Sequence, residues 1–316
     1  MMEIRIDAES IERAYEANRP FLASTRLLET RDGRGRRVFL KLETDQPTGS
    51  FKVRGALFNL LSRPEARNGF VAASAGNHGL GVAWAAQRTK RREPVTIFVP
   101  STAPATKIAK LRTYLLDLRV GGATFDDAER SAHEFERETG AQFIHAYDDP
   151  LTVAGQGSVA LEIVEALSEV GTLVVPVGGG GLISGNAAWF KRRRPGVRIV
   201  AVQPDASPAL AESIRLGRAL LEYPAGPTLA DGLSGGIGRF VFAHRDLIDQ
   251  VVNVPEATIR SAIQHLHRGS GVRAEASGAI ALAAASLPQS EGWPEPVVCI
   301  ITGGNIDQTI LDTILS

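Results

Sequence analysis

The chain has 316 residues, of which 44% are hydrophobic and 22% are charged. These values are ordinary for a globular protein and allow one large domain or two associated ones. The 35 basic side chains balance the 35 acidic ones, so no net field attracts nucleic acid or an anionic membrane, and neither is expected as a partner.

The single cysteine, Cys299, lies inside an apolar run, which excludes a disulfide framework and favours a reducing, cytoplasmic setting. Residues 1–10 lack the apolar core of a signal peptide, and no stretch is long enough to span a bilayer. The basic run 191–194 stands before Pro195 and Gly196, where we expect the solvated end of a helix.

Short β-rich runs alternate with longer segments of helical spacing, which predicts an α/β fold with mainly parallel sheets and helices on both faces. The expected strands are residues 38–42, 70–73, 95–99, 142–145, 172–177, 197–202 and 297–301. The expected helices are residues 50–60, 126–140, 152–167 and 258–267. Ser50 is expected to cap the first helix, and Asp126 with Glu129 to form a capping box for the second.

Ligands of open parallel sheets bind beyond the carboxyl ends of the strands, where loops lead into helices. Four such turns carry unusual residues, namely 48–55, 74–81, 178–185 and 302–307. We therefore expect these four loops to form the functional site.

The loop at 178–185 follows an apolar strand and begins with four consecutive glycines. Backbone N–H groups in such a loop can converge on an anion at the positive end of the next helix, so we expect a phosphate site. The loop lacks the Lys-Ser/Thr pair of a Walker A motif, and position 203 is Gln where a dinucleotide fold carries an acid, which argues against a nucleotide. A tightly packed structural turn is the alternative.

Lys52 stands in the first turn of the helix predicted after residue 50. The positive end of the helix dipole disfavours a cation there and is expected to lower the pKa of Lys52, as a nucleophilic amine requires. A solvent-exposed lysine is the alternative, and only the neighbouring motifs favour the catalytic interpretation.

The loop at 74–79, Ser-Ala-Gly-Asn-His-Gly, begins another helix. Its small residues offer N–H groups to a substrate carboxylate, and Asn77 can donate to a phenolate-type oxygen. His78 can act as an acid or base, or it can simply shape the loop. In the fourth loop the Thr302 hydroxyl can meet a ring nitrogen, and capping of the next helix is the alternative.

These motifs together resemble those of the serine/threonine dehydratase and serine racemase family, which uses pyridoxal 5'-phosphate (PLP). The matching segments are 50–56 (SFKVRGA), 74–78 (SAGNH), 154–157 (AGQG), 178–181 (GGGG), 230–232 (ADG), 275–279 (EASGA) and 302–305 (TGGN). They cover nearly the whole chain. The resemblance implies the two-lobed PLP fold type II (tryptophan synthase β-like), with a large PLP-binding domain of residues 1–66 and 147–316 and a small inserted domain of residues 67–146.

The resemblance also implies a role for each loop. Lys52 would form the Schiff base with PLP, and Phe51 would lie beside the cofactor ring. Asn77 would contact the ring hydroxyl, and Thr302 would contact the ring nitrogen. The residues implied for the phosphate are Gly178, Gly179, Gly180, Gly181 and Leu182, and those for the substrate carboxylate are Ser74, Ala75, Gly76 and His78.

The implied activity is that of a PLP-dependent threonine/serine-type ammonia-lyase (dehydratase). Such an enzyme eliminates water from a β-hydroxy amino acid to give a 2-oxo acid and ammonia, and it usually forms a homodimer or homotetramer. A related substrate, such as a hydroxyaspartate or an ectoine-pathway intermediate, stays open. An amino-acid (serine) racemase and a non-catalytic PLP- or phosphate-binding module are the alternatives.

Three positions depart from the family pattern. Ala75 stands where racemases carry a serine as second base, and a methyl group cannot exchange a proton, which favours the lyase. Gln203 and Asp205 offer too few carboxylates for a divalent metal, so we expect no metal site and weak or absent magnesium dependence. Tyr147 stands where dehydratases often have Phe and racemases Asn, so its hydroxyl can contact substrate or solvent.

Overall fold

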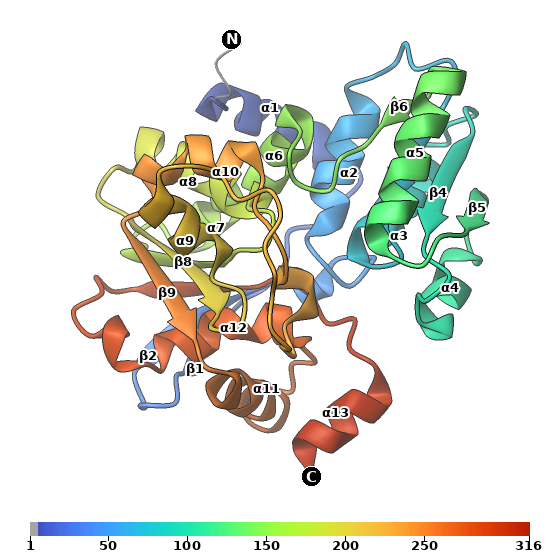
Figure 1. Cartoon of the computed structure of the whole chain (residues 1–316). Coiled ribbons are helices and arrows are strands. Elements are labelled where there is room, and N and C mark those ends of the chain that lie inside the picture. Colours follow the sequence, from blue (N-terminus) through green and yellow to red (C-terminus); the bar gives the residue numbers. More distant parts are fainter. Residues whose placement is uncertain (1–5) are drawn as a thin grey trace.

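The computed structural model describes residues 6–316 and contains two β-sheets flanked by helices (Figure 1). The larger sheet has six strands in the order β1-β2-β10-β7-β8-β9, and only β1 runs antiparallel to its neighbour. Its strands are β1 (Leu27–Arg31), β2 (Arg37–Leu42), β7 (Thr172–Pro176), β8 (Arg198–Pro204), β9 (Gln250–Val254) and β10 (Val297–Ile301).

The smaller sheet has four parallel strands in the order β5-β4-β3-β6. They are β3 (Phe70–Ala73), β4 (Val95–Val99), β5 (Asp117–Val120) and β6 (Gln142–Phe143). All four come from one continuous stretch of chain between β2 and β7, and Figure 1 shows this stretch to the right of the larger sheet.

Thirteen α-helices connect and cover the strands within residues 6–316. They are α1 (Ala8–Asn18), α2 (Lys52–Leu61), α3 (Asn77–Arg88), α4 (Ala105–Leu111), α5 (Phe125–Thr139), α6 (Pro150–Gly157), α7 (Val159–Ala166), α8 (Gly181–Arg193), α9 (Ala209–Leu216), α10 (Arg239–Ala243), α11 (Glu256–Ser270), α12 (Ala276–Ala285) and α13 (Gln308–Leu315). Short 3-10 turns add η1 (Glu43–Asp45), η2 (Asp231–Leu233), η3 (Arg245–Leu247) and η4 (Pro288–Ser290). None of the helices in this part of the chain is long and apolar enough to cross a bilayer.

The larger sheet is buried on both faces, which explains why its central strands read as continuous apolar runs. Side chains such as Leu40 and Cys299 pack on one face with α11, α12 and α13. Their neighbours, such as Phe39 and Val298, pack on the opposite face with α1, α6, α7 and α8. The alternation follows from the two-residue period of a strand. Helix α2 joins the two sheets, because it packs against both α6 and α3.

The predicted α/β class and every predicted strand are found, with shifts of one or two residues at the ends. Strands β1, β5 and β9 were not predicted from the sequence. β1 and β5 lie at sheet edges and expose charged side chains, so they lack the apolar run of a buried strand. Cys299 is buried, as expected, and the basic run 191–194 does end α8.

Both predicted helix caps are wrong. Ser50 is buried in a bridge to Gly303, and α2 begins at Lys52 without a side-chain cap. The capping box of α5 is formed by Thr124 and Asp127, because the reciprocal bonds need an acceptor one residue before the helix.

The helix predicted at 152–167 is two helices, α6 and α7, which meet at Ser158. Asp149 caps α6 and Pro150 occupies its first turn, two start signals that the apolar spacing alone did not show. The helix predicted at 258–267 is α11, which is longer at both ends.

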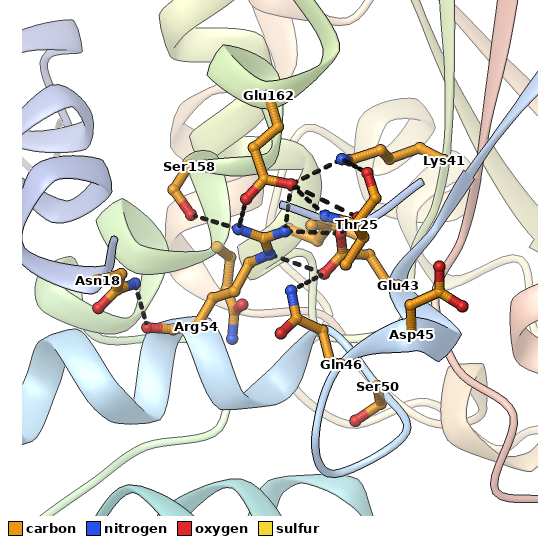
Figure 2. Close-up of polar contacts among 12 residues, drawn as sticks. Asn18, Thr25, Lys41, Glu43, Asp45, Gln46, Ser50, Arg54, Ser158 and Glu162 are labelled. Atoms are coloured by element: carbon orange, nitrogen blue, oxygen red, sulfur yellow. Dashed lines mark hydrogen bonds and ion pairs between the residues drawn. The ribbon is translucent and has the colours of Figure 1, made fainter. Parts of the chain in front are cut away.

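A buried ionic network fixes the start of α2 (Figure 2). The guanidinium of Arg54 binds Glu43 at 2.7 and 2.8 Å and Glu162 at 2.7 and 2.8 Å. Lys41 completes the group, because its Nζ donates to Glu162 at 2.6 Å and to the carbonyl of Thr25 at 2.7 Å. Two cations and two anions balance, and the four charged side chains are at most 5% exposed. Such a network is costly to break because each remaining charge would lack its partner.

We predict that Arg54→Met lowers the free energy of unfolding by about 3–5 kcal/mol, because it leaves Glu43 and Glu162 buried with too little positive charge. Urea unfolding of the apoprotein measures this loss. Arg26→Met is the matched control, since Arg26 pairs with Asp45 at the surface and its removal should cost much less. Equal losses for the two variants would contradict this account.

Candidate active site

A cleft of about 2120 Å³ lies beyond the carboxyl ends of β3, β7 and β10. Loops from both sheets line it, so residues far apart in the sequence face one space. All thirteen site residues predicted from the sequence line this cleft: Phe51, Lys52, Ser74, Ala75, Gly76, Asn77, His78, Gly178, Gly179, Gly180, Gly181, Leu182 and Thr302. Their positions agree with the prediction, and their individual roles stay predictions.

Lys52 is the first residue of α2, and its Nζ donates a hydrogen bond to the carbonyl of Ala146 at 2.9 Å. Burial lowers the pKa of Lys52 to about 8, while the negative charge of Glu275 acts in the opposite direction. The lowered pKa was predicted, but removal from water is the leading cause, in addition to any effect of the helix end. A sizeable fraction of Lys52 is therefore a neutral amine at neutral to mildly alkaline pH.

The glycine loop connects β7 to α8 and has the geometry of an anion site. Gly180 has φ 88°, a left-handed conformation that favours glycine, and no side chain caps the first turn of α8. A Cβ on Gly179 would lie 2.2 Å from the ring of Tyr147, so only glycine fits there. The uncapped N–H groups at the start of α8 suit a phosphate, because no competing side chain occupies them.

Asn77 begins α3, and its side-chain amide is held on both sides. Its Nδ2 donates to Glu275 Oε1 at 2.8 Å, and its Oδ1 accepts from Asn305 Nδ2 at 2.7 Å. An amide nitrogen carries two hydrogens, so one N–H of Asn77 stays available to a ligand oxygen.

Thr302 follows β10 and is 3% exposed. Its Oγ1 donates its one hydrogen to the carbonyl of Ser277 at 3.2 Å, so the hydroxyl must turn this hydrogen away from Ser277 to donate to a ring nitrogen. The alternative of a helix cap is wrong, because Asp307 caps α13.

The substrate loop is less open than predicted. The N–H of Ser74 donates to the carbonyl of Phe98 at 3.1 Å, and the N–H of Gly76 donates to Ser74 Oγ at 3.1 Å. The first turn of α3 has no side-chain cap, and it offers the better donors to a carboxylate.

His78 is buried, and its Nε2 lies 2.8 Å from the carbonyl of Ile144, which can only accept. Nε2 therefore carries the hydrogen. Burial, followed by the positive charge of Lys52, lowers the pKa of His78 to about 3. A neutral imidazole of this kind is a weak base, so the geometry favours the loop-shaping alternative.

Gln203 occupies the position expected of a metal ligand. Its Oε1 accepts hydrogen bonds from the backbone N–H groups of Leu210 at 3.0 Å and Ala211 at 3.3 Å, so it binds the start of α9. Within residues 6–316, no three His, Cys, Asp or Glu side chains are grouped to hold a metal ion. Weak or absent magnesium dependence stays a prediction.

Two groups at the site were not among the predicted site residues. The Glu275 carboxylate accepts a hydrogen bond from Asn77, and its charge acts on Lys52. It was named from the sequence only as the first residue of the matching segment 275–279, without a role. Tyr147 lies against the glycine loop, and burial, followed by the charge of Glu129, raises its pKa to about 12. No pattern in the sequence indicates the Glu275 contact, because its partners lie far away along the chain.

The comparisons agree with this geometry. Residues 14–303 match the family model described as pyridoxal-phosphate dependent enzyme. An L-threonine ammonia-lyase of Thermotoga maritima is 42% identical over 89% of this chain and 70% of its own length. The structure of maize serine racemase superposes with a TM-score of 0.90 at 33% identity, over 98% of this chain and 96% of that one. The processed form of threonine deaminase isoform 2 from Solanum lycopersicum superposes with a TM-score of 0.87 at 32% identity, over 97% and 90%.

The cleft and the two sheets thus define a fold type II enzyme in which the glycine loop and Lys52 line one cleft. The chain belongs to the pyridoxal-phosphate dependent enzyme family, and PLP is its cofactor. The predicted family, fold class, cofactor and lyase-type enzyme are confirmed by these relatives.

We predict that Gly179→Ala weakens PLP binding at least about tenfold, or ~1.4 kcal/mol, because the new methyl group displaces the Tyr147 ring and distorts the loop. Fluorescence titration of the apoenzyme with PLP gives the dissociation constant. The control is Gly196→Ala, where a Cβ meets no atom within 4 Å. Unchanged affinity in Gly179→Ala would argue against the loop as the phosphate site.

We also predict that the Lys52 amine in the apoenzyme reacts with an amine-specific reagent half-maximally near pH 8. Only the neutral amine reacts, so burial moves its reactivity to lower pH than that of an ordinary lysine. Pulse labelling over a pH series that runs from mildly acidic to strongly alkaline, followed by peptide mass spectrometry, measures the midpoint. A midpoint at the ordinary lysine value, about pH 10.4, would show that Lys52 is solvated.

Proposed function

We propose that the protein is a threonine/serine-type ammonia-lyase, which converts a β-hydroxy amino acid to a 2-oxo acid and ammonia. The observation that carries the proposal is the pairing of a partly buried, weakly basic Lys52 with Ala75 in one cleft. A single proton acceptor suits elimination, whereas racemisation needs a second group to return a proton to the opposite face.

In this proposal the four loops hold the cofactor. Residues 178–182 bind its phosphate, Phe51 lies beside its ring and Thr302 faces the ring nitrogen. Asn77 donates its remaining N–H to the ring oxygen, and Lys52 is the covalent attachment point. When bound, the cofactor delocalises the negative charge that forms on the substrate α-carbon.

The residues of the chain then do the following. The loop at 74–78 binds the substrate carboxylate, with the N–H groups at the start of α3 as its main donors, and this orients the α-hydrogen towards Lys52. The neutral Lys52 amine, released when the substrate amino group takes its place, accepts this proton. The β-hydroxyl then leaves as water with a proton from the cofactor phosphate or its surroundings. The neutral hydroxyl of Thr302 does not hold the ring nitrogen protonated, which limits charge build-up and favours elimination over side reactions.

The carboxylates around Tyr147 favour a substrate side chain without a negative charge. The pKa of Tyr147 is raised by burial and then by Glu129, Asp148 and Asp126, so the hydroxyl stays protonated and can donate to the substrate. The same carboxylates would repel a second carboxylate on the substrate. We therefore favour serine or threonine over a hydroxyaspartate, and a neutral ectoine-pathway intermediate stays a candidate.

The racemase alternative rests on the similarity to maize serine racemase. It predicts formation of the other enantiomer without 2-oxo acid. A non-catalytic module is less favoured, because it has no need of the lowered pKa of Lys52.

We further propose that residues 67–146 form a small domain that closes on the remainder, residues 1–66 and 147–316, and excludes water. The grouping of β3 to β6 in this stretch supports the division. A cytoplasmic homodimer or homotetramer is proposed on the family resemblance.

The test is a screen of β-hydroxy amino acids, both enantiomers of each, for release of 2-oxo acid. We predict turnover by the wild type and none by Lys52→Ala, whose glycine loop should still bind phosphate. Ala75→Ser should gain measurable racemisation because it adds a second proton-exchanging group. Residual turnover in Lys52→Ala would reject the proposed base, and wild-type racemisation without 2-oxo acid would favour the isomerase.

A further inference from the structure

Glu275 joins the two parts of the cleft. Glu275 is the residue before α12, a helix that packs against the larger sheet. Its carboxylate contacts the first residue of α3, a helix that packs against the smaller sheet. Glu275 Oε1 accepts from Asn77 Nδ2 at 2.8 Å. The contact spans 198 residues of sequence, so it depends on how the two parts of the chain meet.

A chain of side-chain bonds continues from this contact. Asn305 Nδ2 donates to Asn77 Oδ1 at 2.7 Å and to the carbonyl of Thr48 at 2.8 Å. Lys110, on α4, donates to Asn305 Oδ1 at 3.3 Å. Each amide group therefore has a defined donor and acceptor side. The direction of the hydrogen bonds is set at both ends, because an ionised Glu275 and the Thr48 carbonyl can only accept, whereas the Lys110 ammonium can only donate.

Charged groups from several elements face Glu275. Burial raises its pKa to about 7, and Asp231 of η2 acts in the same direction, whereas Asn77 and Lys107 of α4 lower it. Lys107 also lies 3.6 Å from Asp231. The negative charge of Glu275 in turn raises the pKa of Lys52 on α2. Above pH 7 the carboxylate is mostly ionised, and this form holds the Asn77 amide in one orientation.

A protonated or neutral group at this position would act differently. A carboxylic acid or a carboxamide can donate as well as accept, so only the bond from Asn305 would still oppose a rotation of the Asn77 amide that presents Oδ1 to the cleft. An exposed Oδ1 would repel a phenolate oxygen, since both are acceptors. The orientation of Asn77 therefore depends on the charge at residue 275 as well as on the bond from Asn305.

We propose that Glu275 is a positioning residue that fixes the Asn77 amide towards the cofactor ring oxygen through their hydrogen bond. From the lining of the same cleft, its negative charge also stabilises the ammonium form of Lys52. This inference rests on the proposed cofactor site and adds two separable functions of one carboxylate. The first acts on cofactor affinity, and the second acts on the protonation of Lys52.

The variants Glu275→Gln and Glu275→Asp separate these functions. Glu275→Gln removes the charge and the fixed acceptor, so we expect PLP affinity of the apoenzyme to fall about tenfold, and the pH midpoint of Lys52 labelling to move lower. Glu275→Asp keeps the charge but withdraws it from Asn77, so affinity should fall while the midpoint stays near that of the wild type. Glu222→Gln is the matched control, because it removes an exposed carboxylate that lines the same cleft.

A double-mutant cycle with Asn77→Ala tests whether Glu275 acts on cofactor affinity through Asn77. If Glu275 acts on the cofactor through Asn77, Glu275→Gln should cost little further affinity once Asn77 is alanine. Wild-type affinity and an unchanged midpoint in Glu275→Gln would overturn the proposal, as would equal effects from Glu222→Gln. The proposed lyase function is tested separately by 2-oxo acid release, so its failure leaves these binding and labelling results interpretable. If the wild type bound no PLP, both would be rejected.

Discussion

The position of α2 depends on the buried guanidinium of Arg54, which is held between the carboxylates of Glu43 and Glu162. Residues two apart in a helix point in nearly opposite directions. Arg54 therefore anchors α2 within the larger part of the protein, and Lys52 projects into the cleft. Four paired charges are a costly way to stabilise a core, since an apolar cluster would do as well. Their directed geometry, however, defines the rotation of the helix that carries the reactive amine.

The chemistry of the cleft follows from placing charges in a poorly hydrated space. Burial destabilises the charged forms of Lys52 and Glu275 relative to their neutral forms. It lowers the pKa of Lys52 to about 8 and raises that of Glu275 to about 7. The two values approach each other, so both protonation states of each group are accessible near neutral pH. His78 and Tyr147 behave differently, because their pKa values move away from neutrality and they remain uncharged. The site thus combines two titrating groups with a neutral scaffold.

Much of this arrangement could be predicted from the sequence. The strands at the centre of the larger sheet are apolar on both faces, and the glycine run at 178–181 marks the turn between β7 and α8 that lines the cleft. The contacts between distant segments could not be predicted. Glu275 and Asn77 are 198 residues apart, and the two failed helix caps at Ser50 and Asp126 depended on local context that a pattern does not contain. Edge strands such as β1 were missed because half-exposed strands carry charges that resemble loops.

The central claim is that one amine, positioned by α2, binds the cofactor covalently beside the glycine loop. Borohydride reduction of the PLP-loaded protein, followed by peptide mapping, tests it most directly, because reduction makes the lysine linkage permanent. We expect the reduced cofactor on the peptide that contains Lys52 and on no other lysine. A cofactor found on another residue, or no attachment at all, would contradict the account.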